Sequence, residues 1–111
     1  MLATMKQISM DDLNGKLNSI GKDELILDVR TPEEFAEGHI AGARNIDHES
    51  VLDHLEELKR FKTVYVHCRS GGRAGRAVQA LQNAGLTNLV CIGSSGMLHW
   101  VAAGYPVVTG K

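Results

Sequence analysis

The chain has 111 residues, of which 43% are hydrophobic, and its 12 basic and 13 acidic side chains leave a net charge of −1. This length and apolar content suit a single domain with one core, residues 1–111, and leave no room for a second domain. The near-neutral charge excludes a general basic surface for nucleic acid and a polybasic patch for membranes.

The two cysteines stand in unlike surroundings, one in a loop and one in an apolar strand, so they do not indicate a disulfide framework. Residues 1–7 lack the long apolar core of a secretory signal, and no segment reaches membrane-spanning length. We therefore expect a cytoplasmic protein. No spacing of Cys and His resembles a set of metal ligands, and we expect neither a metal nor another cofactor.

Hydrophobic periodicity predicts short strands that alternate with helices along the whole chain. The expected strands cover residues 6–8, 25–30, 43–46, 63–67 and 88–92. The expected helices begin after Ser9, after Thr31, near Ser50, at Ala74 and at Met97, and they end at Gly21, Gly38, Arg60, Gly85 and Gly104.

Local signals support several of these elements. Thr31, Pro32 and Glu34 combine an N-cap, a proline at the first helical position and a capping-box glutamate. The nearly continuous apolar run over 25–30 is typical of a strand buried on both faces of a parallel sheet. The helix near Ser50 is expected to turn one apolar side inward, made up of Val51, Leu52, Leu55 and Leu58.

Alternating strands and helices predict an α/β protein with an open parallel sheet and helices on both faces. Ligands of such sheets bind beyond the carboxyl ends of the strands. Asp28, Cys68 and Gly93 each fall at that end of an expected strand, so we expect one site that includes all three.

The stretch from Thr63 to Val78 is the centre of the predicted site. Its strand leads into a loop, Cys68 to Arg73, and the helix that follows carries an apolar stripe at i, i+3, i+4 and i+7. Free N–H groups at a helix N-terminus form an anion site, and the same field favours a thiolate over a thiol. Gly71 and Gly72 allow the loop to curl its amides around one sulfur atom. The competing interpretation is a buried structural cysteine beside a surface loop.

Three segments resemble single-domain rhodanese sulfurtransferases. They are the loop Cys68-Arg69-Ser70-Gly71-Gly72-Arg73, the stretch from Asp28-Val29-Arg30 through Gly38-His39-Ile40-Ala41-Gly42-Ala43 to Asn45-Ile46, and Gly96-Met97-Leu98-His99-Trp100 with the following Ala102 to Val107. The resemblance covers nearly the whole chain and implies the rhodanese-like fold, with five parallel strands in the order 3-2-4-5-1. Ser95 departs from the family pattern, which usually has a glycine at this position. The departure bears on the shape of the pocket rim and not on the chemistry.

The resemblance also implies an activity, the transfer of a sulfane sulfur through a persulfide on Cys68. The Cys68 thiolate would attack the outer sulfur of a small anionic donor, thiosulfate or a related compound, and pass it to cyanide or a thiol. A sulfur-relay protein is a further candidate partner. The substrate-binding residues are expected to be those of the loop, Arg69, Ser70, Gly71, Gly72 and Arg73. Arg73 is expected to face the anion, whereas Arg69 faces either the anion or water at the pocket rim.

Other polar residues are interpreted as structural. Asp28 and Arg30 are expected to brace neighbouring loops, with an ion pair to Glu33 or Glu34. His39 is read as a structural loop residue. His67 should point to the sheet face opposite Cys68, because successive side chains of a strand alternate. We expect the remaining cysteine, Cys91, and the helix residues Met97 and Trp100 to pack in the core.

Two other function classes remain open. Relatives of the rhodanese fold with a cysteine–arginine loop act on phosphate or arsenate, and the cysteine phosphatases have five residues between cysteine and arginine. This chain has four residues between Cys68 and Arg73, which suits a single sulfur atom better than a tetrahedral phosphate. The third class is a non-catalytic module, and the intact cysteine, glycines and arginine argue against it.

Overall fold

The structure is a computed structural model and describes residues 6–110. Most of the opening segment that we used to judge the absence of a secretory signal therefore lies outside the described residues. Among residues 6–110, no helix is long and apolar enough to cross a membrane.

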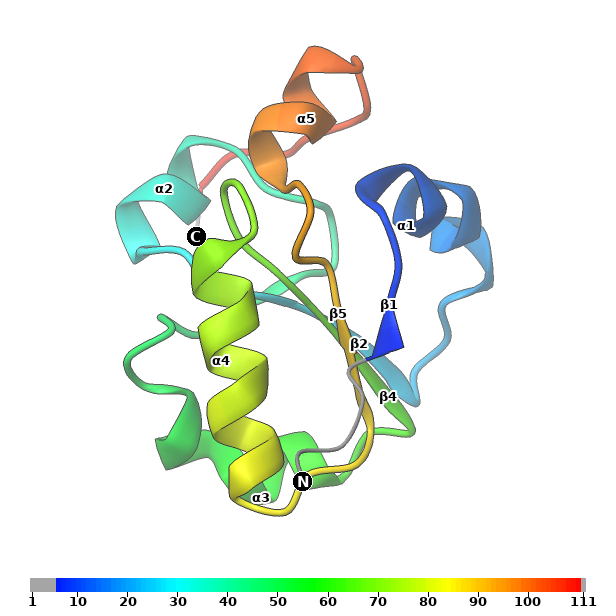
Figure 1. Cartoon of the computed structure of the whole chain (residues 1–111). Helices are drawn as coiled ribbons and strands as arrows, with labels where there is room; N and C mark the ends of the chain where they lie inside the picture. Colours follow the sequence, from blue (N-terminus) through cyan, green and yellow to red (C-terminus); the bar gives the residue numbers. More distant parts are fainter. Residues whose placement is uncertain (1–5, 111) are drawn as a thin grey trace.

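A five-stranded sheet forms the centre of the fold, and all its strand pairs are parallel (Figure 1). Its order, β1-β5-β4-β2-β3, is the predicted order read from the other edge. The strands are β1 (Lys6–Gln7), β2 (Glu24–Asp28), β3 (Arg44–Asn45), β4 (Thr63–His67) and β5 (Leu89–Cys91). β4 lies at the middle of the sheet, which places the end of β4 between the ends of β2 and β5.

Helices cover both faces of the sheet, as predicted. They are α1 (Met10–Lys16), α2 (Pro32–Glu37), α3 (Leu55–Lys59), α4 (Gly72–Asn83) and α5 (Met97–Ala102), with short 3₁₀ turns η1 (Leu17–Ser19) and η2 (Val51–His54). α4 packs on one face together with η2 and α3, and α1 and α5 pack on the other. The sheet therefore lies between two separate apolar clusters.

The predicted apolar stripe of α4 is fully confirmed, because all four of its residues are buried against the sheet. They are Ala74, Ala77, Val78 and Leu81. The predicted cap of α2 is confirmed as well. The Thr31 hydroxyl accepts the Glu34 amide at 3.2 Å, the Glu34 carboxylate accepts the Thr31 amide at 3.1 Å, and the helix ends before Gly38.

Several predicted boundaries were wrong. β2 ends at Asp28 instead of residue 30, because Arg30 turns back to pair with Asp28. α4 starts at Gly72 instead of Ala74, and α1 ends at Lys16, followed by η1 rather than by more α-helix up to Gly21. β4 has the predicted bounds, and the other ends of strands and helices differ by at most two residues.

The helix predicted near Ser50 is divided into η2 and α3, and its inward side was partly wrong. Val51 and Leu58 are buried, but Leu52 is 49% exposed. A 3₁₀ turn has three residues per turn, so the side chains in η2 do not follow the α-helical periodicity on which the prediction rested.

Candidate active site

The thiol of Cys68 lies directly after β4, at the N-terminus of α4. Its Sγ accepts hydrogen bonds from the backbone N–H of Gly71 at 3.1 Å and of Ala74 at 3.3 Å. Ala74 is the third residue of α4, so its amide has no partner within the helix. The sulfur therefore occupies the position that a capping side chain takes at other helices, and Cys68 is only 1% exposed.

Glycine at position 71 is required by both conformation and space. Gly71 precedes α4 with a φ of 114°, in the left-handed region that favours glycine. A Cβ atom at this position would overlap the carbonyl of Gly93, which follows β5. The loop around Cys68 is thus packed directly against the end of the neighbouring strand, as the sequence predicted for Gly93.

The outer side of the loop is held by α5. The first amides of this helix donate to loop carbonyls, Met97 to Cys68 at 2.9 Å and Leu98 to Arg69 at 3.1 Å. A Cβ atom at Gly96 would overlap the same two carbonyls. These contacts hold the backbone of Cys68 and Arg69 against α5, while the amides of Gly71 and Ala74 donate to the sulfur. Sequence reasoning missed this contact, for which the Gly96-Met97 motif was the available signal.

The arginine that closes the loop is held by a glutamate of α2. Arg73 donates to both oxygens of Glu34, at 2.7 and 3.0 Å. These hydrogen bonds from Arg73 lower the pKa of Glu34 to about 2, and the pKa of Arg73 is raised in turn. The positive charge of Arg73 is therefore compensated within the protein, and Arg69 is the exposed arginine of the loop.

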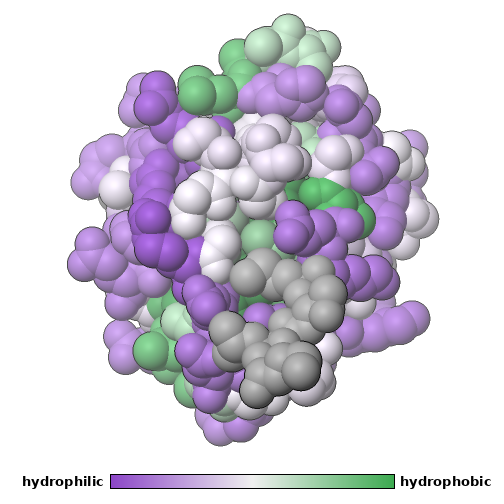
Figure 2. Space-filling view, in the orientation of Figure 1, coloured by the Kyte–Doolittle hydropathy of each residue, from purple (hydrophilic) through white to green (hydrophobic). Residues whose placement is uncertain are grey.

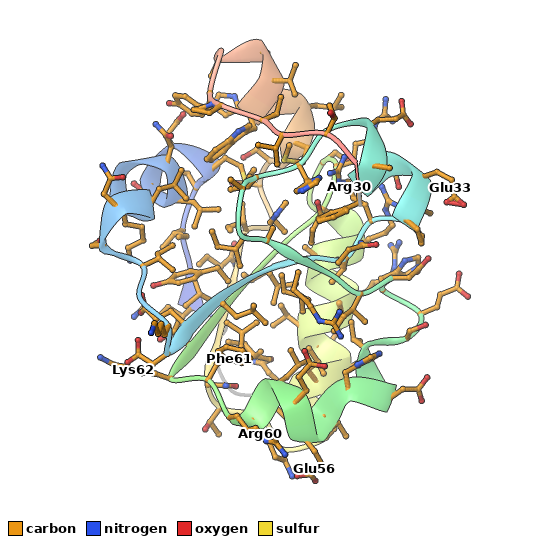
Figure 3. The ribbon with its side chains drawn as sticks, turned by 180° about the vertical axis from the view of Figure 1, so that it is seen from behind. Arg30, Glu33, Glu56, Arg60, Phe61 and Lys62 are labelled. Carbon is orange, nitrogen blue, oxygen red and sulfur yellow. The ribbon has the colours of Figure 1, made fainter. Side chains whose placement is uncertain are left out.

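Asp28 and Arg30 form a buried ion pair with each other, with the Arg30 Nη2 2.7 Å from an Asp28 oxygen. The predicted pair between Arg30 and Glu33 or Glu34 was wrong. Arg30 reaches back over two residues to Asp28 and also donates to the carbonyl of Gly38 at 2.8 Å. In Figure 3, Glu33 lies at the edge of the molecule and points away from Arg30.

Asn45 is a further part of this network that the sequence analysis did not single out. Its amide donates to the carbonyls of Asp28 and Arg30, both at 3.0 Å. It thereby ties the end of β3 to the turn that follows β2. A polar amide at the end of an expected edge strand, beside Asp28, was the signal that could have identified it.

The other candidate side chains lie where the sequence placed them. His67 is fully buried beside Asp28, with 4.0 Å between the ring and the carboxylate, and burial lowers its pKa. His39 is stacked on Phe35 and bonded to its carbonyl at 2.8 Å, which makes it structural. Cys91 is buried in the same cluster as Cys68, and its pKa is raised by burial and then by the nearby Cys68.

The core anchors of α5 are confirmed, since Trp100 is fully buried and Met97 is 3% exposed. Within residues 6–110, the single cluster of potential metal ligands is Asp47, His48 and Glu49, which does not include Cys68. This cluster is partly exposed and acidic, a common surface feature, and it gives the Cys68 site no metal ligands.

A depression of about 380 Å³ opens beside the loop, between α2 and α5. Its polar side includes Arg69, Glu34 and Glu37, and its apolar side is formed by α5. Leu98 and Val101 of α5 are 53% and 61% exposed. Figure 2 shows apolar atoms at the top of the molecule, where α5 lies in Figure 1.

The parallel sheet in this order, with a cysteine loop between its central strand and a helix, defines a class of α/β proteins. The model of the rhodanese-like domain family matches residues 9–103 of the chain. The chain therefore belongs to the rhodanese-like domain family.

Individual relatives agree with this assignment. The chain is 42% identical over 75 residues to an uncharacterized protein, YqhL, of Bacillus subtilis, with 68% of the chain and 59% of that protein covered. It is 28% identical to a sulfurtransferase of Allochromatium vinosum, with 94% of the chain and 95% of that protein covered. A crystal structure of a rhodanese-related protein from Thermoplasma volcanium superposes with a TM-score of 0.78 at 35% identity, covering 93% and 97% of the two chains.

Proposed function

We propose that this protein is a sulfurtransferase that carries a sulfane sulfur as a persulfide on Cys68. The observation that carries the proposal is the pair of amides, from Gly71 and Ala74, that converge on Sγ at the N-terminus of α4. This arrangement stabilises negative charge on sulfur before any substrate is bound. The family and the sulfurtransferase name of a relative that covers nearly the whole chain support the same class.

The first step is an attack of the Cys68 thiolate on the outer sulfur of the donor. With thiosulfate, the donor S–S bond breaks, a new S–S bond to Sγ forms, and sulfite leaves with the electron pair. In the second step a thiolate or cyanide attacks the terminal sulfur and regenerates the Cys68 thiolate. No proton transfer and no external oxidant is needed in either step, so the route uses only the nucleophile and the loop.

The surrounding residues support this chemistry by position. The amides of Gly71 and Ala74 donate to Sγ, and we expect the transferred sulfur to bind among the residues of the loop, Arg69, Ser70, Gly71, Gly72 and Arg73. The Asp28–Arg30 pair holds the neighbouring turn through Gly38 and does not touch the sulfur. Arg69, at the exposed rim, meets the incoming anion, and a thiol of a small molecule or of a sulfur-relay protein accepts the sulfur.

The test is intact mass before and after exposure to thiosulfate, followed by cyanide. We expect one added sulfur atom on the wild-type chain, its removal by cyanide, and steady turnover with both reagents. Cys68→Ser should remain folded and gain no sulfur, because a hydroxyl cannot form the persulfide. Substantial turnover by Cys68→Ser would show that the nucleophile is assigned to the wrong residue.

Phosphate hydrolysis is the alternative function, and it can be measured on the same protein. Sγ receives two amides, whereas a bound phosphate needs donors for three peripheral oxygens as well. Each oxygen without a donor forfeits a charge-assisted hydrogen bond of about 1.5–3 kcal/mol. We therefore expect negligible hydrolysis of aryl phosphates, and efficient turnover that depends on Cys68 would favour a phosphatase instead.

A further inference from the structure

A cleft lies on the face of the sheet that α1 and α5 cover, apart from the Cys68 loop. It has a volume of about 550 Å³ and is bounded by η1, the loop 40–42 and the C-terminal segment 106–108. Its lining includes Ile26 of β2 and Ile40, which are both buried in the apolar cluster of this face. The cleft shares no lining residue with the depression beside Arg69. It is therefore a separate site.

The sides of the cleft are aliphatic. Leu17 and Ile20 come from η1 and the residue after it, and Val107 and Val108 come from the C-terminal segment. Val107 and Val108 are each 43% exposed, although they adjoin other apolar side chains of the cleft. Among the described residues, no aromatic side chain lines the cleft. Such a surface suits a flexible alkyl chain better than a flat ring, because it offers no aromatic face for stacking.

The C-terminal segment is held in place, so this side of the cleft is formed before a ligand binds. Val108 exchanges two backbone hydrogen bonds with His39, both at 2.8 Å. The carbonyl of Pro106 accepts a hydrogen bond from the indole of Trp100, also at 2.8 Å, and Trp100 is fully buried. A ligand does not have to order this segment, which lowers the entropic cost of binding.

The cleft carries a positive charge that the described residues leave uncompensated. Lys22 lines the cleft, is exposed, and forms no salt bridge within residues 6–110. Glu24 also lines the cleft, but its carboxylate accepts the Tyr65 hydroxyl at 3.2 Å, and the Lys16 ammonium lies 3.5 Å from the same hydroxyl. Lys16 therefore balances Glu24. Asp23, which follows Lys22 in the chain, does not line the cleft.

We propose that the cleft binds an aliphatic monocarboxylate of medium length, with about six to ten carbon atoms. The alkyl chain covers apolar surface that is otherwise in contact with water, and the carboxylate pairs with Lys22. The volume of about 550 Å³ is within the range of sites for small organic ligands. Binding is non-covalent and does not involve Cys68, so this site is additional to the proposed sulfurtransferase function.

The experiment titrates the full chain with octanoate and with hexanoate and follows the backbone amide signals by NMR. We expect saturable one-to-one binding of octanoate, with the largest shifts at cleft residues such as Gly42 and Val107 and none at Gly71 and Gly72 of the Cys68 loop. Each buried methylene group tightens binding about fourfold, so octanoate should bind about tenfold or more tightly than hexanoate.

Lys22→Gln tests the contact with the carboxylate. This variant should bind octanoate about threefold more weakly than the wild type and lose most of the salt dependence of binding. Octylammonium, which has the same chain and the opposite charge, should bind the wild type more weakly than octanoate does. Lys62→Gln is the matched control and should bind as the wild type does, because Lys62 is exposed near the start of β2 but does not line the cleft (Figure 3).

Val107→Ser tests the contact with the alkyl chain independently of charge. It should weaken octanoate binding by about threefold to fivefold, as expected for the loss of about 40 Å² of apolar contact. Leu52→Ser is the control, since Leu52 is similarly exposed, at 49%, but lies on η2 away from the cleft. Val107 is partly exposed, so the variant should fold even if another change in the cleft does not.

The outcomes test this site separately from the proposed function. Binding that does not saturate, that shifts the signals of the Cys68 loop instead of those of the cleft, or that neither Lys22→Gln nor Val107→Ser weakens would overturn the inference. Octylammonium binding as tight as that of octanoate would overturn it too. Cys68→Ser should bind octanoate as the wild type does, because the cleft includes no residue of the loop. A failure of sulfur loading therefore leaves this inference standing, and a failure of octanoate binding leaves the sulfurtransferase proposal standing.

Discussion

Replacing Gly96 by alanine should displace the Cys68 loop without touching any side chain of the site. Gly96 has extended backbone angles that alanine can adopt, so the effect depends on space alone. An alanine Cβ would lie less than 3.0 Å from the carbonyl oxygens of Cys68 and Arg69. A carbonyl oxygen and a carbon atom need more than about 3 Å, so the loop or α5 has to move by roughly 1 Å.

The size of the effect follows from the contacts that this movement disturbs. Two hydrogen bonds, from Met97 to Cys68 and from Leu98 to Arg69, would be stretched, and each contributes about 0.5–1.5 kcal/mol. Overpacking adds about 1–3 kcal/mol. We expect a loss of about 2–6 kcal/mol in the free energy of unfolding. A displacement of about 1 Å at the reacting atoms also reduces the rate of sulfur loading by about a hundredfold.

The assay combines urea denaturation with the rate of sulfur loading on Cys68. Gly75→Ala is the matched control, since a Cβ there would meet nothing within 4 Å. Gly75 lies inside α4, so alanine should stabilise the protein by about 0.5–1 kcal/mol and leave loading unchanged. If Gly96→Ala has wild-type stability and loads sulfur at the wild-type rate, the packing of α5 on the loop does not position the thiol.

Two further predictions concern Cys91 and acid stability. Cys91→Ser should lose about 1–3 kcal/mol of stability, because the substitution buries a hydroxyl in an apolar cluster. The variant should still load sulfur on Cys68 at the wild-type rate. Loss of sulfur loading would show that Cys91 takes part in the sulfur relay. The folded pKa of Glu34, about 2, is below its ordinary 4.5, so its contribution is fully present above about pH 4.5 and is lost as the pH falls toward 2. This pKa shift corresponds to at most about 3 kcal/mol of stability, and solvent screening reduces it to about 1–2 kcal/mol because the side chains of the pair are 22–25% exposed. The free energies of unfolding of the wild type and of Glu34→Gln should therefore differ by about 1–2 kcal/mol at pH 6 and converge near pH 2.

The family and the sheet could be predicted from the sequence because their signals are local or repeated along the chain. The apolar stripe of α4, the capping box at Thr31 and the position of Cys68 after a buried strand each depend on a few neighbouring residues. Side-chain alternation along β4 likewise separated Cys68 from His67 correctly. These features depend on covalent geometry and on helix and strand periodicity, which the amino-acid order determines directly.

Charge pairing and the inward side of η2 required the tertiary structure. The sequence suggested Glu33 or Glu34 as the partner of Arg30, but Arg30 pairs with Asp28 and Glu34 pairs with Arg73, 39 residues away. Which carboxylate lies nearest to a guanidinium depends on how α2 sits beside α4, and a long arginine side chain can reach several candidates. The exposure of Leu52 in η2 depended in the same way on a short helix whose periodicity changes along its length.

The sequence by itself therefore determined the alternation of strands and helices, the place of the thiol and the presence of a loop that can turn its amides toward sulfur. The order of the strands came from the resemblance to the rhodanese family and is confirmed by the structure. The tertiary structure decided how that loop is held and how much of its positive charge is free. Both depend on contacts between segments far apart in the chain, α5 on the carbonyls of Cys68 and Arg69 and α2 on Arg73. Local periodicity carries no information about such contacts, because it describes each helix and strand without its neighbours.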